Sequence, residues 1–358
     1  MTALPPHAQP ARRASRSPAH GAKWSFATRR ANRTDAAGLD RNLAATQPGD
    51  LVLAEVTRIG SHKRLQLAEG RYSPLWPGDR IVVACADRYA VDQFDGRARL
   101  SEGGADLLAG GGVAGQIVSR NEKLTRGTRL SVLGRLTDQA GVPLNTGRYG
   151  LTPAARGCPP LVLAVLGTGM NAGKTAAAAG IVNGFARLGR RVAALKVTGT
   201  GSFGDVHEYE AAGAARVLDF TDAGMATTNR QPIERLIAAT DLLLVHAGGC
   251  DVAVVELADG VSQVETAALL SRPDYVARFD GAILAAPDAM AARGGIAWLG
   301  DHGIRPIALS GVLTRAPLAA EEIARATTLP VLCRTTLADP ATAAAIETRL
   351  TDKDRVAA

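Results

Sequence analysis

The carboxyl-terminal half of the chain alternates short, continuous apolar runs with longer alanine-rich stretches of helical length. The apolar runs lie at residues 161–166, 192–197, 252–257, 281–286, 304–309 and 330–333. Runs that are apolar at every position are typical of strands buried on both faces of a sheet. Because helix-length stretches separate these runs, the pattern predicts an α/β domain with a mostly parallel sheet.

Residues 47–150 show a different pattern, in which short apolar runs are separated by turn dipeptides such as Pro48-Gly49 and Pro77-Gly78. The runs are rich in Val, Leu and Ile and lie at 51–56, 80–84, 112–118 and 129–136. Short strands at close spacing, with Gly and Pro between them, predict a small β-rich domain that is either a barrel or a sandwich.

These patterns divide the chain of 358 residues into five parts. Residues 1–46 are predicted to be a basic, disordered tail, and residues 47–150 the β-rich domain. A proline-containing linker at 151–160 leads into the α/β domain at 161–340. A C-terminal helix or tail is expected at 341–358.

The formal net charge is +7, and the excess of cations lies at the amino terminus. Residues 1–34 contain no acid and seven cations, namely Arg12, Arg13, Arg16, Lys23, Arg29, Arg30 and Arg33. A segment without apolar periodicity cannot bury enough surface to offset its chain entropy, which predicts disorder. An arginine-rich targeting segment and a weak contact with nucleic acid or an anionic surface are the alternatives. The rest of the chain has no basic patch interleaved with aromatic residues, so nucleic-acid binding is not favoured.

The apolar, aromatic and cysteine contents indicate the kind of core and exclude some kinds of site. Apolar residues make up 46% of the chain and aromatic residues only 4%, so the core is expected to rest on Ala, Val and Leu. The four cysteines, Cys85, Cys158, Cys250 and Cys333, are widely separated, so neither a zinc site nor a disulfide framework is expected. This usage fits a reduced, cytoplasmic location, and no uncharged apolar stretch is long enough to predict a membrane span.

The strongest chemical signal is the sequence GTGMNAGKT at 167–175, between the first apolar run and a helix-forming stretch. It differs from the strict G-x-x-x-x-G-K-[ST] pattern because Gly167 stands one residue before the first position of that pattern, which is Thr168. Backbone N–H groups and the helix terminus would hold phosphates, with Lys174 on the β- and γ-phosphates and Thr175 on Mg²⁺. The alternative is a loop that only joins strand to helix, with Lys174 as a solvated cation. The expected nucleotide-binding residues are Gly167, Thr168, Gly169, Met170, Asn171, Ala172, Gly173, Lys174 and Thr175.

Two acids are predicted to join Thr175 in holding Mg²⁺. Glu256 lies near the end of an apolar run, where parallel strands place their ligand-binding groups. Its alternative role is to cap the next helix, for which Asp259 is the better candidate. Asp205 follows the second apolar run after a glycine-rich stretch, and Asp219 and Asp222 compete with it for the metal.

For other polar residues the sequence leaves more than one partner open. Lys196 lies in an apolar run, where an unpaired charge is costly, so it meets either a phosphate or substrate carboxylate or a core acid. His207 and His246 are isolated and are expected to be structural. The polar loop DRYAVDQFDG at 87–96 could reach a ligand, although a surface turn is the simpler interpretation.

The combination of G-T-x-x-x-x-G-K-T at 167–175, Lys196 and Glu256 resembles dethiobiotin synthetase. It is also similar to relatives of that enzyme, namely the cobyrinic and cobyric acid amide synthases and the dethiobiotin-synthetase-like D-glutamate N-acetyltransferases. The stretches SGVLT and LPVLC resemble the late strands of that fold, so the resemblance covers about residues 161–335. It does not extend to the β-rich domain.

The resemblance implies a P-loop NTPase fold and a set of roles. Lys174 and Thr175 would hold ATP and Mg²⁺, Asp205 and Glu256 would complete the metal shell, and Lys196 would meet the substrate. The family reaction phosphorylates a carboxylate or carbamate, and an amine then captures the acyl phosphate.

Two departures from the family pattern affect the ligands. The family glutamate is usually followed by a glycine-rich stretch, whereas Glu256 is followed by Leu257-Ala258-Asp259, which leaves the substrate contacts open. Thr314 is expected at the base, where the family often has an asparagine that reads adenine, so GTP is possible in place of ATP.

Three functions follow from these observations. The first is a nucleotide- and Mg²⁺-dependent, ligase-like enzyme that activates a small carboxylate, with Lys174, Lys196 and Glu256 as catalytic residues. The second is an ATP- or GTP-binding switch or accessory protein that acts through the β-rich domain. The third is a CoA-dependent N-acyltransferase on the same fold. A homodimer is a possible assembly for each of them.

Overall fold

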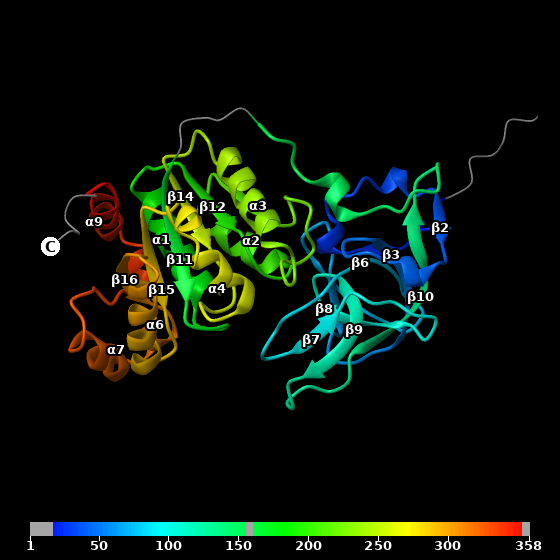
Figure 1. The fold of residues 1–358 in the computed structure, drawn as a ribbon, viewed down its shortest axis with the longest axis horizontal. Helices are drawn as coiled ribbons and strands as arrows, with labels where there is room; N and C mark the ends of the chain where they lie inside the picture. The colour runs from blue at the N-terminus through cyan, green and yellow to red at the C-terminus, as the bar shows by residue number, and fades with distance from the viewer. Residues whose placement is uncertain (1–16, 155–159, 353–358) are drawn as a thin grey trace, which may run out of the picture.

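The computed structural model describes residues 17–154 and 160–352, which form two domains lying side by side (Figure 1). The first domain, coloured from blue to blue-green, is built of strands. The second, coloured from green to red, has helices around a central sheet. An α/β domain preceded by a β-rich domain is the order that the sequence predicts.

The β-rich domain is a small barrel. Its described strands are β1 (Lys23–Trp24), β2 (Gly38–Asp40), β3 (Leu51–Arg58), β4 (Arg64–Gln66), β5 (Tyr72–Pro74), β6 (Arg80–Cys85), β7 (Phe94–Arg97), β8 (Ala105–Ala109), β9 (Val113–Arg120) and β10 (Thr128–Thr137). Its short 3₁₀ helices are η1 (Phe26–Thr28), η2 (Arg33–Asp35), η3 (Leu43–Ala45) and η4 (Thr146–Tyr149). The larger sheet follows the order β1-β6-β3-β10-β8-β9-β7, and β2 pairs with β10. Because β6 also pairs with β9, the sheet closes on itself, and the barrel is the correct one of the two predicted architectures.

The prediction of a disordered tail is wrong for residues 17–46. Strand β1 pairs with β6 and β2 pairs with β10, so both belong to the barrel sheet. Trp24 is buried against Leu51 and Leu53, whose side chains lie on the outer side of β3. The segment was missed because two- and three-residue strands are too short for hydrophobic alternation to appear in the sequence. Residues 1–16 of the predicted tail lie outside the described residues.

The α/β domain is built on a parallel sheet. Its strands, in the described part of the chain, are β11 (Leu161–Gly167), β12 (Val192–Lys196), β13 (Arg216–Asp219), β14 (Val252–Glu256), β15 (Gly281–Ala285) and β16 (Pro306–Ser310). They follow the order β13-β12-β14-β11-β15-β16, and the neighbouring pairs run parallel. Strand β11, which leads into the predicted phosphate loop, therefore lies between β14 and β15 near the centre of the sheet.

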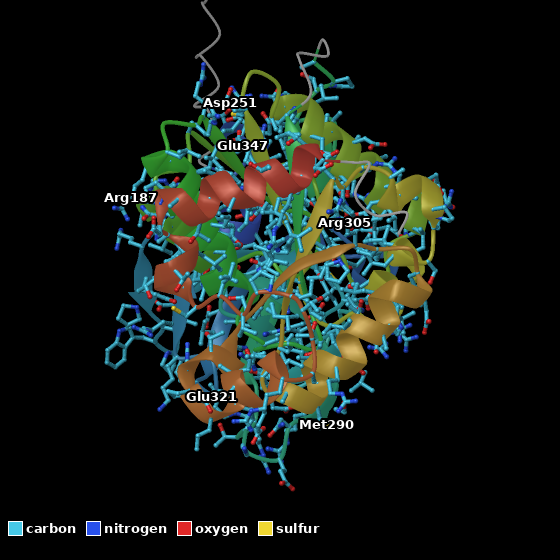
Figure 2. The ribbon with its side chains drawn as sticks, turned by 90° about the vertical axis from the view of Figure 1, so that its left-hand side faces the viewer. Arg187, Asp251, Met290, Arg305, Glu321 and Glu347 are labelled. Carbon is cyan, nitrogen blue, oxygen red and sulfur yellow. The ribbon has the colours of Figure 1, made fainter. Side chains whose placement is uncertain are left out.

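Helices cover both faces of this sheet, which explains the continuous apolar runs. The helices are α1 (Lys174–Arg187), α2 (Phe203–Ala211), α3 (Ile233–His246), α4 (Val264–Leu270), α5 (Pro273–Val276), α6 (Ala289–Asp301), α7 (Pro317–Ala324), α8 (Arg334–Leu337) and α9 (Pro340–Thr351), with η5 at Val312–Arg315. Along β11, Leu163 and Val165 pack against α1, α2, α8 and α9. Ala164 and Leu166 pack against helices α3 to α7. Figure 2 shows the end of the domain where Arg187 of α1 and Glu347 of α9 lie.

In the α/β domain, one strand was not predicted and one predicted run is not a strand. Strand β13 was missed because its four residues, Arg216–Asp219, are half polar and form an edge of the sheet. The apolar run at 330–333 is not a strand, and only an isolated parallel bridge joins Val331 to Leu309. Helix α9 was expected beyond residue 340, and its buried Ile346 shows that it packs as part of the α/β domain.

Several contacts join the two domains around the carboxyl edge of the parallel sheet. Arg29 of the β-rich domain forms ion pairs with Asp219 at 3.1 Å and with Asp222 at 2.7 Å. The side chain of Gln66 accepts from the backbone N–H of Phe203 at 2.7 Å and donates to Ser202 at 3.1 Å. The basic residues near the amino terminus therefore include part of an interface. Among the described residues, no helix is both long enough and apolar enough to cross a membrane.

Candidate nucleotide-binding site

The predicted phosphate loop is a tight turn between β11 and α1. Gly173 has a φ of +96°, and a Cβ there would lie 3.0 Å from the Cα of Gly311. Asn171 also has a positive φ, of +66°. The loop is therefore compact because a glycine stands where the chain turns and where η5 approaches.

Lys174 folds back into this loop. Its Nζ donates to the carbonyl of Gly169 at 2.9 Å and to the carbonyl of Asp259, and the residue is only 6% exposed. A Cβ at Gly167 would lie 2.8 Å from the Lys174 side chain, so this glycine makes room for the lysine. Burial lowers the pKa of Lys174, and the nearby charge of Glu256 opposes that change. The structure thus excludes the alternative of an ordinary solvated cation.

Thr175 lies between the two predicted acidic ligands. Its hydroxyl lies 3.2 Å from a carboxylate oxygen of Asp205 and 3.3 Å from one of Glu256, so its single proton can be donated to either acid. Asp205 stands in the first turn of α2, and Glu256 is the last residue of β14. Three residues that are far apart in the sequence therefore bring their oxygens together at the carboxyl edge of the sheet.

Lys196 completes this cluster. It ends β12 directly beside Glu256, with which it is in register, and its Nζ lies 3.4 Å from that carboxylate and 2.6 Å from Asp205. Burial alone would lower the pKa of Lys196, but the charges of Asp205 and Glu256 outweigh it and raise the pKa. Lys196 is thus paired with acids, and these acids are the ones that the sequence assigns to the metal.

Tyr209 is a member of the cluster that sequence reasoning missed. This tyrosine of α2 is buried, and its hydroxyl donates to Glu256. Burial and the neighbouring carboxylates raise its pKa well above the usual value, so the hydroxyl keeps its proton. A signal was available, because Tyr209 follows Asp205 by four residues and so lies on the same face of a helix.

The oxygens at this edge suit a hard cation. Magnesium is usually held by one or two carboxylates together with phosphate oxygens and water, rather than by an all-protein cage. Thr175, Asp205 and Glu256 provide such a set, and within the described residues no group of three or more His, Cys, Asp and Glu side chains is arranged to hold a metal. The competing acids Asp219 and Asp222 pair instead with Arg29.

A cavity of about 420 Å³ opens over the loop, and we call it the phosphate cavity. It is lined by Arg88, Tyr89, Met170, Asn171, Gly173, Lys174, Thr175, Ala176, Lys196, Gly199, Thr200, Asp205, Glu256, Ala258 and Asp259. Arg88 and Tyr89 come from the β-rich domain, and Asp92 of the same loop accepts from Asn171 at 3.0 Å. The polar loop at 87–96 therefore reaches the site, contrary to its interpretation as a surface turn.

Thr314 lies on the other side of the phosphate loop. It lines a cavity of about 240 Å³ together with Gly173 at the start of α1 and Arg315, Cys333 and Arg334. Hydrogen bonds from Thr335 and Thr336 lower the pKa of Cys333 to about 7. This placement, beside the loop and away from the acidic cluster, is compatible with the predicted contact between Thr314 and a base.

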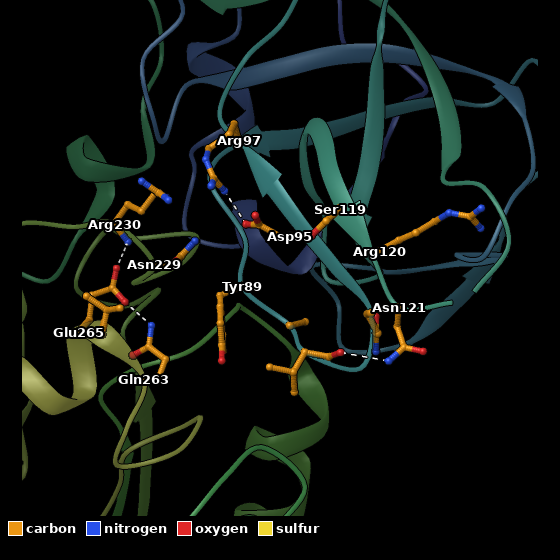
Figure 3. Close-up of a pocket in the computed structure, with 14 residues that line it drawn as sticks. Tyr89, Asp95, Arg97, Ser119, Arg120, Asn121, Asn229, Arg230, Gln263 and Glu265 are labelled. Carbon is orange, nitrogen blue, oxygen red and sulfur yellow. Dashed lines mark hydrogen bonds and ion pairs between the residues drawn. The ribbon is translucent and has the colours of Figure 1, made fainter. Parts of the chain in front are cut away.

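A larger cleft of about 540 Å³ separates the domains beyond Tyr89 (Figure 3). Both acids that line this cleft have partners within the protein. Asp95 forms an ion pair with Arg97, and Glu265 accepts from the backbone of Arg230 at 2.6 Å and from Gln263. Figure 3 shows these pairs on opposite walls, with Tyr89 between them.

The structure also tests the roles predicted for Asp259, His207 and His246. The side chain of Gln263 caps α4, so the assignment of that role to Asp259 is wrong. Burial raises the pKa of Asp259, which lines the phosphate cavity, to about 6. His207 stacks on Phe203, and His246 bonds to the carbonyl of Thr152 at 2.9 Å, so both make structural contacts.

No protein-family model and no curated protein matches the chain. Among solved structures, the kinase domain of the tyrosine kinase ETK from Escherichia coli is 16% identical, over 44% of this chain and 70% of its own, with a TM-score of 0.33. The signal recognition particle receptor FtsY from Elizabethkingia anophelis is 14% identical, over 52% and 66%, with a TM-score of 0.33. A nucleotide-binding protein from Archaeoglobus fulgidus, solved in complex with ADP, is 12% identical, over 54% and 91%, with a TM-score of 0.33.

Similarity of this degree does not define a family, so the class of the domain follows from its own geometry. The first strand of a parallel sheet leads through a G-K-T loop into a helix, with Lys174 folded into the loop. An acid from the neighbouring strand lies beside Thr175. This arrangement is that of a P-loop nucleotide-binding domain.

Proposed function

We propose that the protein is a nucleotide- and Mg²⁺-dependent enzyme that phosphorylates a small carboxylate and uses the acyl phosphate to form an amide or a ring. The observation that carries this proposal is the position of Lys196. It is a second lysine beside the phosphate loop, held at the two acids that flank Thr175. A loop that only binds a nucleotide has no need of it, whereas a carboxylate substrate needs a cation to bring it to the γ-phosphate.

The residues of the cluster take distinct roles in this proposal. Lys174 binds the β- and γ-phosphates, and Lys196 orients the substrate carboxylate. Thr175, Asp205 and Glu256 would hold Mg²⁺, which would neutralise charge on the phosphoryl oxygens. Tyr209 keeps the Glu256 carboxylate in place through its hydrogen bond.

The chemistry is a phosphoryl transfer followed by an acyl transfer. A carboxylate oxygen of the substrate attacks the γ-phosphorus, and the bond from that phosphorus to the β–γ bridging oxygen breaks. The nucleoside diphosphate leaves with the electron pair, and an acyl phosphate remains. An amine then attacks the acyl carbon and loses a proton, and inorganic phosphate leaves.

A nucleotide-controlled switch is the second candidate, and a specific contact favours it. Asn171 in the phosphate loop bonds to Asp92 in the β-rich domain, so the loop is mechanically connected to the other domain. A switch predicts slow nucleotide hydrolysis that no small acid stimulates.

The test is release of nucleoside diphosphate by the full-length chain with Mg²⁺ and either ATP or GTP. Pools of small carboxylic acids, with and without amines, are added one at a time. The Lys174→Ala variant is the blank, because loss of this cation is expected to lower turnover about 100-fold or more. The exposed Lys123→Ala variant controls for the loss of a lysine.

A pool that raises release in wild type and in Lys123→Ala, but not in Lys174→Ala, supports the enzyme. Equal, slow release with every pool contradicts it and favours the switch. Binding of CoA esters in preference to nucleotides would instead support the N-acyltransferase.

A further inference from the structure

A cavity of about 430 Å³ adjoins the phosphate cavity on the side of the β-rich domain, and we call it the basic cavity. The stretch around β4 forms one wall, with His62, Lys63 and Arg64. Thr200 and Arg88 line both this cavity and the phosphate cavity. The two spaces therefore meet at these two residues.

The charges around the basic cavity have one sign. Lys63, Arg64 and Arg88 line it, and no acidic residue is among its described lining residues. Within the parts of the chain that the structure describes, none of these three cations forms an ion pair. Cations gathered in a concave site produce a positive potential that attracts small anions.

Two of these cations, Arg88 and Arg64, are held by contacts within the protein. Arg88 is only 8% exposed, and its guanidinium donates to the carbonyl of Leu108 and, at 2.9 Å, to Gln93. Its Nε is buried without a hydrogen-bond partner. Arg64 lies over the Tyr72 ring, 4.3 Å from the centroid. An anion that enters the cavity thus meets two arginines already held in place, which lowers the entropic cost of binding.

The larger interdomain cleft has a smaller imbalance, because three arginines line it together with two acids. Its acids Asp95 and Glu265 already have partners, and it shares only Tyr89 with the phosphate cavity. The basic cavity shares a cation with the phosphate cavity and has no internal acid to neutralise it. Charge and position therefore both favour the basic cavity as the site of an anion near the transferred phosphoryl group.

We propose that the basic cavity binds a small polyanion through Lys63, Arg64 and Arg88. This inference rests on the proposed function and makes the ligand its substrate, with one carboxylate at Lys196 and at least one further anionic group in the basic cavity. The further group is a carboxylate or a phosphate, which the same cations recognise.

The test measures binding to the full-length chain by calorimetry, at constant ionic strength and with saturating Mg²⁺ and a non-hydrolysable nucleotide. Tricarballylate and succinate probe the carboxylate arm, 3-phosphoglycerate probes the phosphate arm, and acetate is the reference. The variant is Lys63→Gln/Arg64→Gln, and the control is Arg41→Gln/Lys123→Gln. Each pair removes one exposed arginine and one exposed lysine, so the net charge changes equally.

At least one polyanion is expected to bind wild type and the control about tenfold more tightly than acetate does. The Lys63→Gln/Arg64→Gln variant is expected to weaken that polyanion about tenfold while nucleotide affinity stays unchanged. The arm with the tighter ligand identifies carboxylate or phosphate as the further group.

Three outcomes overturn the proposal: no preference for any polyanion over acetate, equal affinity in the variant and wild type, or an equal loss of nucleotide affinity in the variant. The last would mean that these cations bind the nucleotide itself. Polyanion binding that the variant loses, with no acid stimulating diphosphate release, supports the site and contradicts the proposed function. Stimulation by a monocarboxylate that the variant retains overturns the site and supports that function.

Discussion

The phosphate cavity and the basic cavity meet at Arg88 and Thr200 but differ in how their charges are balanced. In the phosphate cavity, Lys196 pairs with Asp205 and Glu256, and Lys174 donates to two backbone carbonyls. In the basic cavity, the described cations have no acid partner. Groups of the protein itself therefore hold the lysines of the phosphate cavity, whereas no acid neutralises the cations of the basic cavity.

This difference in charge balance indicates which step of the reaction each cavity affects. A cluster whose members hold one another is oriented before the reaction begins, which lowers the reorganisation needed in the transition state. Unpaired cations add attraction for an anion without orienting a reaction. Substitutions in the phosphate cavity are thus expected to change turnover, and those in the basic cavity to change affinity.

The largest expected effect comes from Glu256→Gln. Replacing this carboxylate removes one charge from beside Thr175 and Lys196, so turnover is expected to fall about 100-fold while the nucleotide still binds. Rates of diphosphate release and calorimetric nucleotide affinity measure the two effects. Glu321→Gln, on the exposed face of α7, is the control. If turnover and nucleotide affinity fell together, the result would contradict a role of Glu256 in turnover alone.

The ion pairs of Arg29, which are among the contacts between the two domains, are the next to test. Arg29→Ala leaves Asp219 and Asp222 buried without this partner, which is expected to cost about 3 kcal/mol of unfolding free energy. Urea unfolding followed by tryptophan fluorescence measures it. The exposed Arg33, paired with Glu69, is the control, and Arg33→Ala is expected to cost about 1 kcal/mol or less. Similar losses in both variants would show that the Arg29 contact is as weak as a surface pair.

A smaller change is expected from Tyr209→Phe. The substitution keeps the buried ring but removes the hydroxyl that donates to Glu256, so kcat is expected to fall about tenfold with little change in KM. The control is Tyr72→Phe, because Tyr72 is 47% exposed and its ring contact with Arg64 is kept. An unchanged kcat for Tyr209→Phe would mean that Glu256 needs no support from the tyrosine.

The smallest effect is a pH-dependent reaction of Cys333, beside Thr314. Because its pKa is lowered to about 7, the thiolate forms as the pH rises through 7, and alkylation by iodoacetamide is expected to accelerate from pH 6 and level off by about pH 8. Cys85 and Cys250 are buried, and a Cys158→Ser background removes the fourth cysteine. Bound nucleotide is expected to slow the reaction several-fold if its base occupies this cavity. Thr336→Val, which removes one hydrogen bond to the sulfur, should shift the rise to higher pH.

Much of the α/β domain could be predicted because its signals are local. A strand buried on both faces is apolar at each position, and the runs at 161–166 and 252–257 match β11 and β14 within one residue. The G-K-T sequence joins a strand to a helix, so the position of Lys174 and Thr175 follows from the sequence. Parallel strands end at one edge of the sheet, which is why Glu256 and Lys196 could be expected near the loop.

The elements and contacts that the sequence did not predict have a common physical cause. Short edge elements such as β1 and β13 have too few residues to display a period, and partners in space complete them. Arg29 was assigned to a disordered tail because its acid partners, Asp219 and Asp222, lie 190 or more residues away. The residues next to Arg29 in the sequence do not predict such an ion pair.

By itself, the sequence determined the two-domain order, the parallel sheet and the phosphate loop, because each of them depends on the pattern of residues that are close together in the chain. Only the tertiary structure decided that residues 17–46 belong to the barrel and that Arg88 reaches the phosphate cavity. It also decided that Lys63 and Arg64 face an anion-sized space beside Thr200. Those features depend on how two domains pack against each other, and packing between distant segments leaves no periodic trace along the chain.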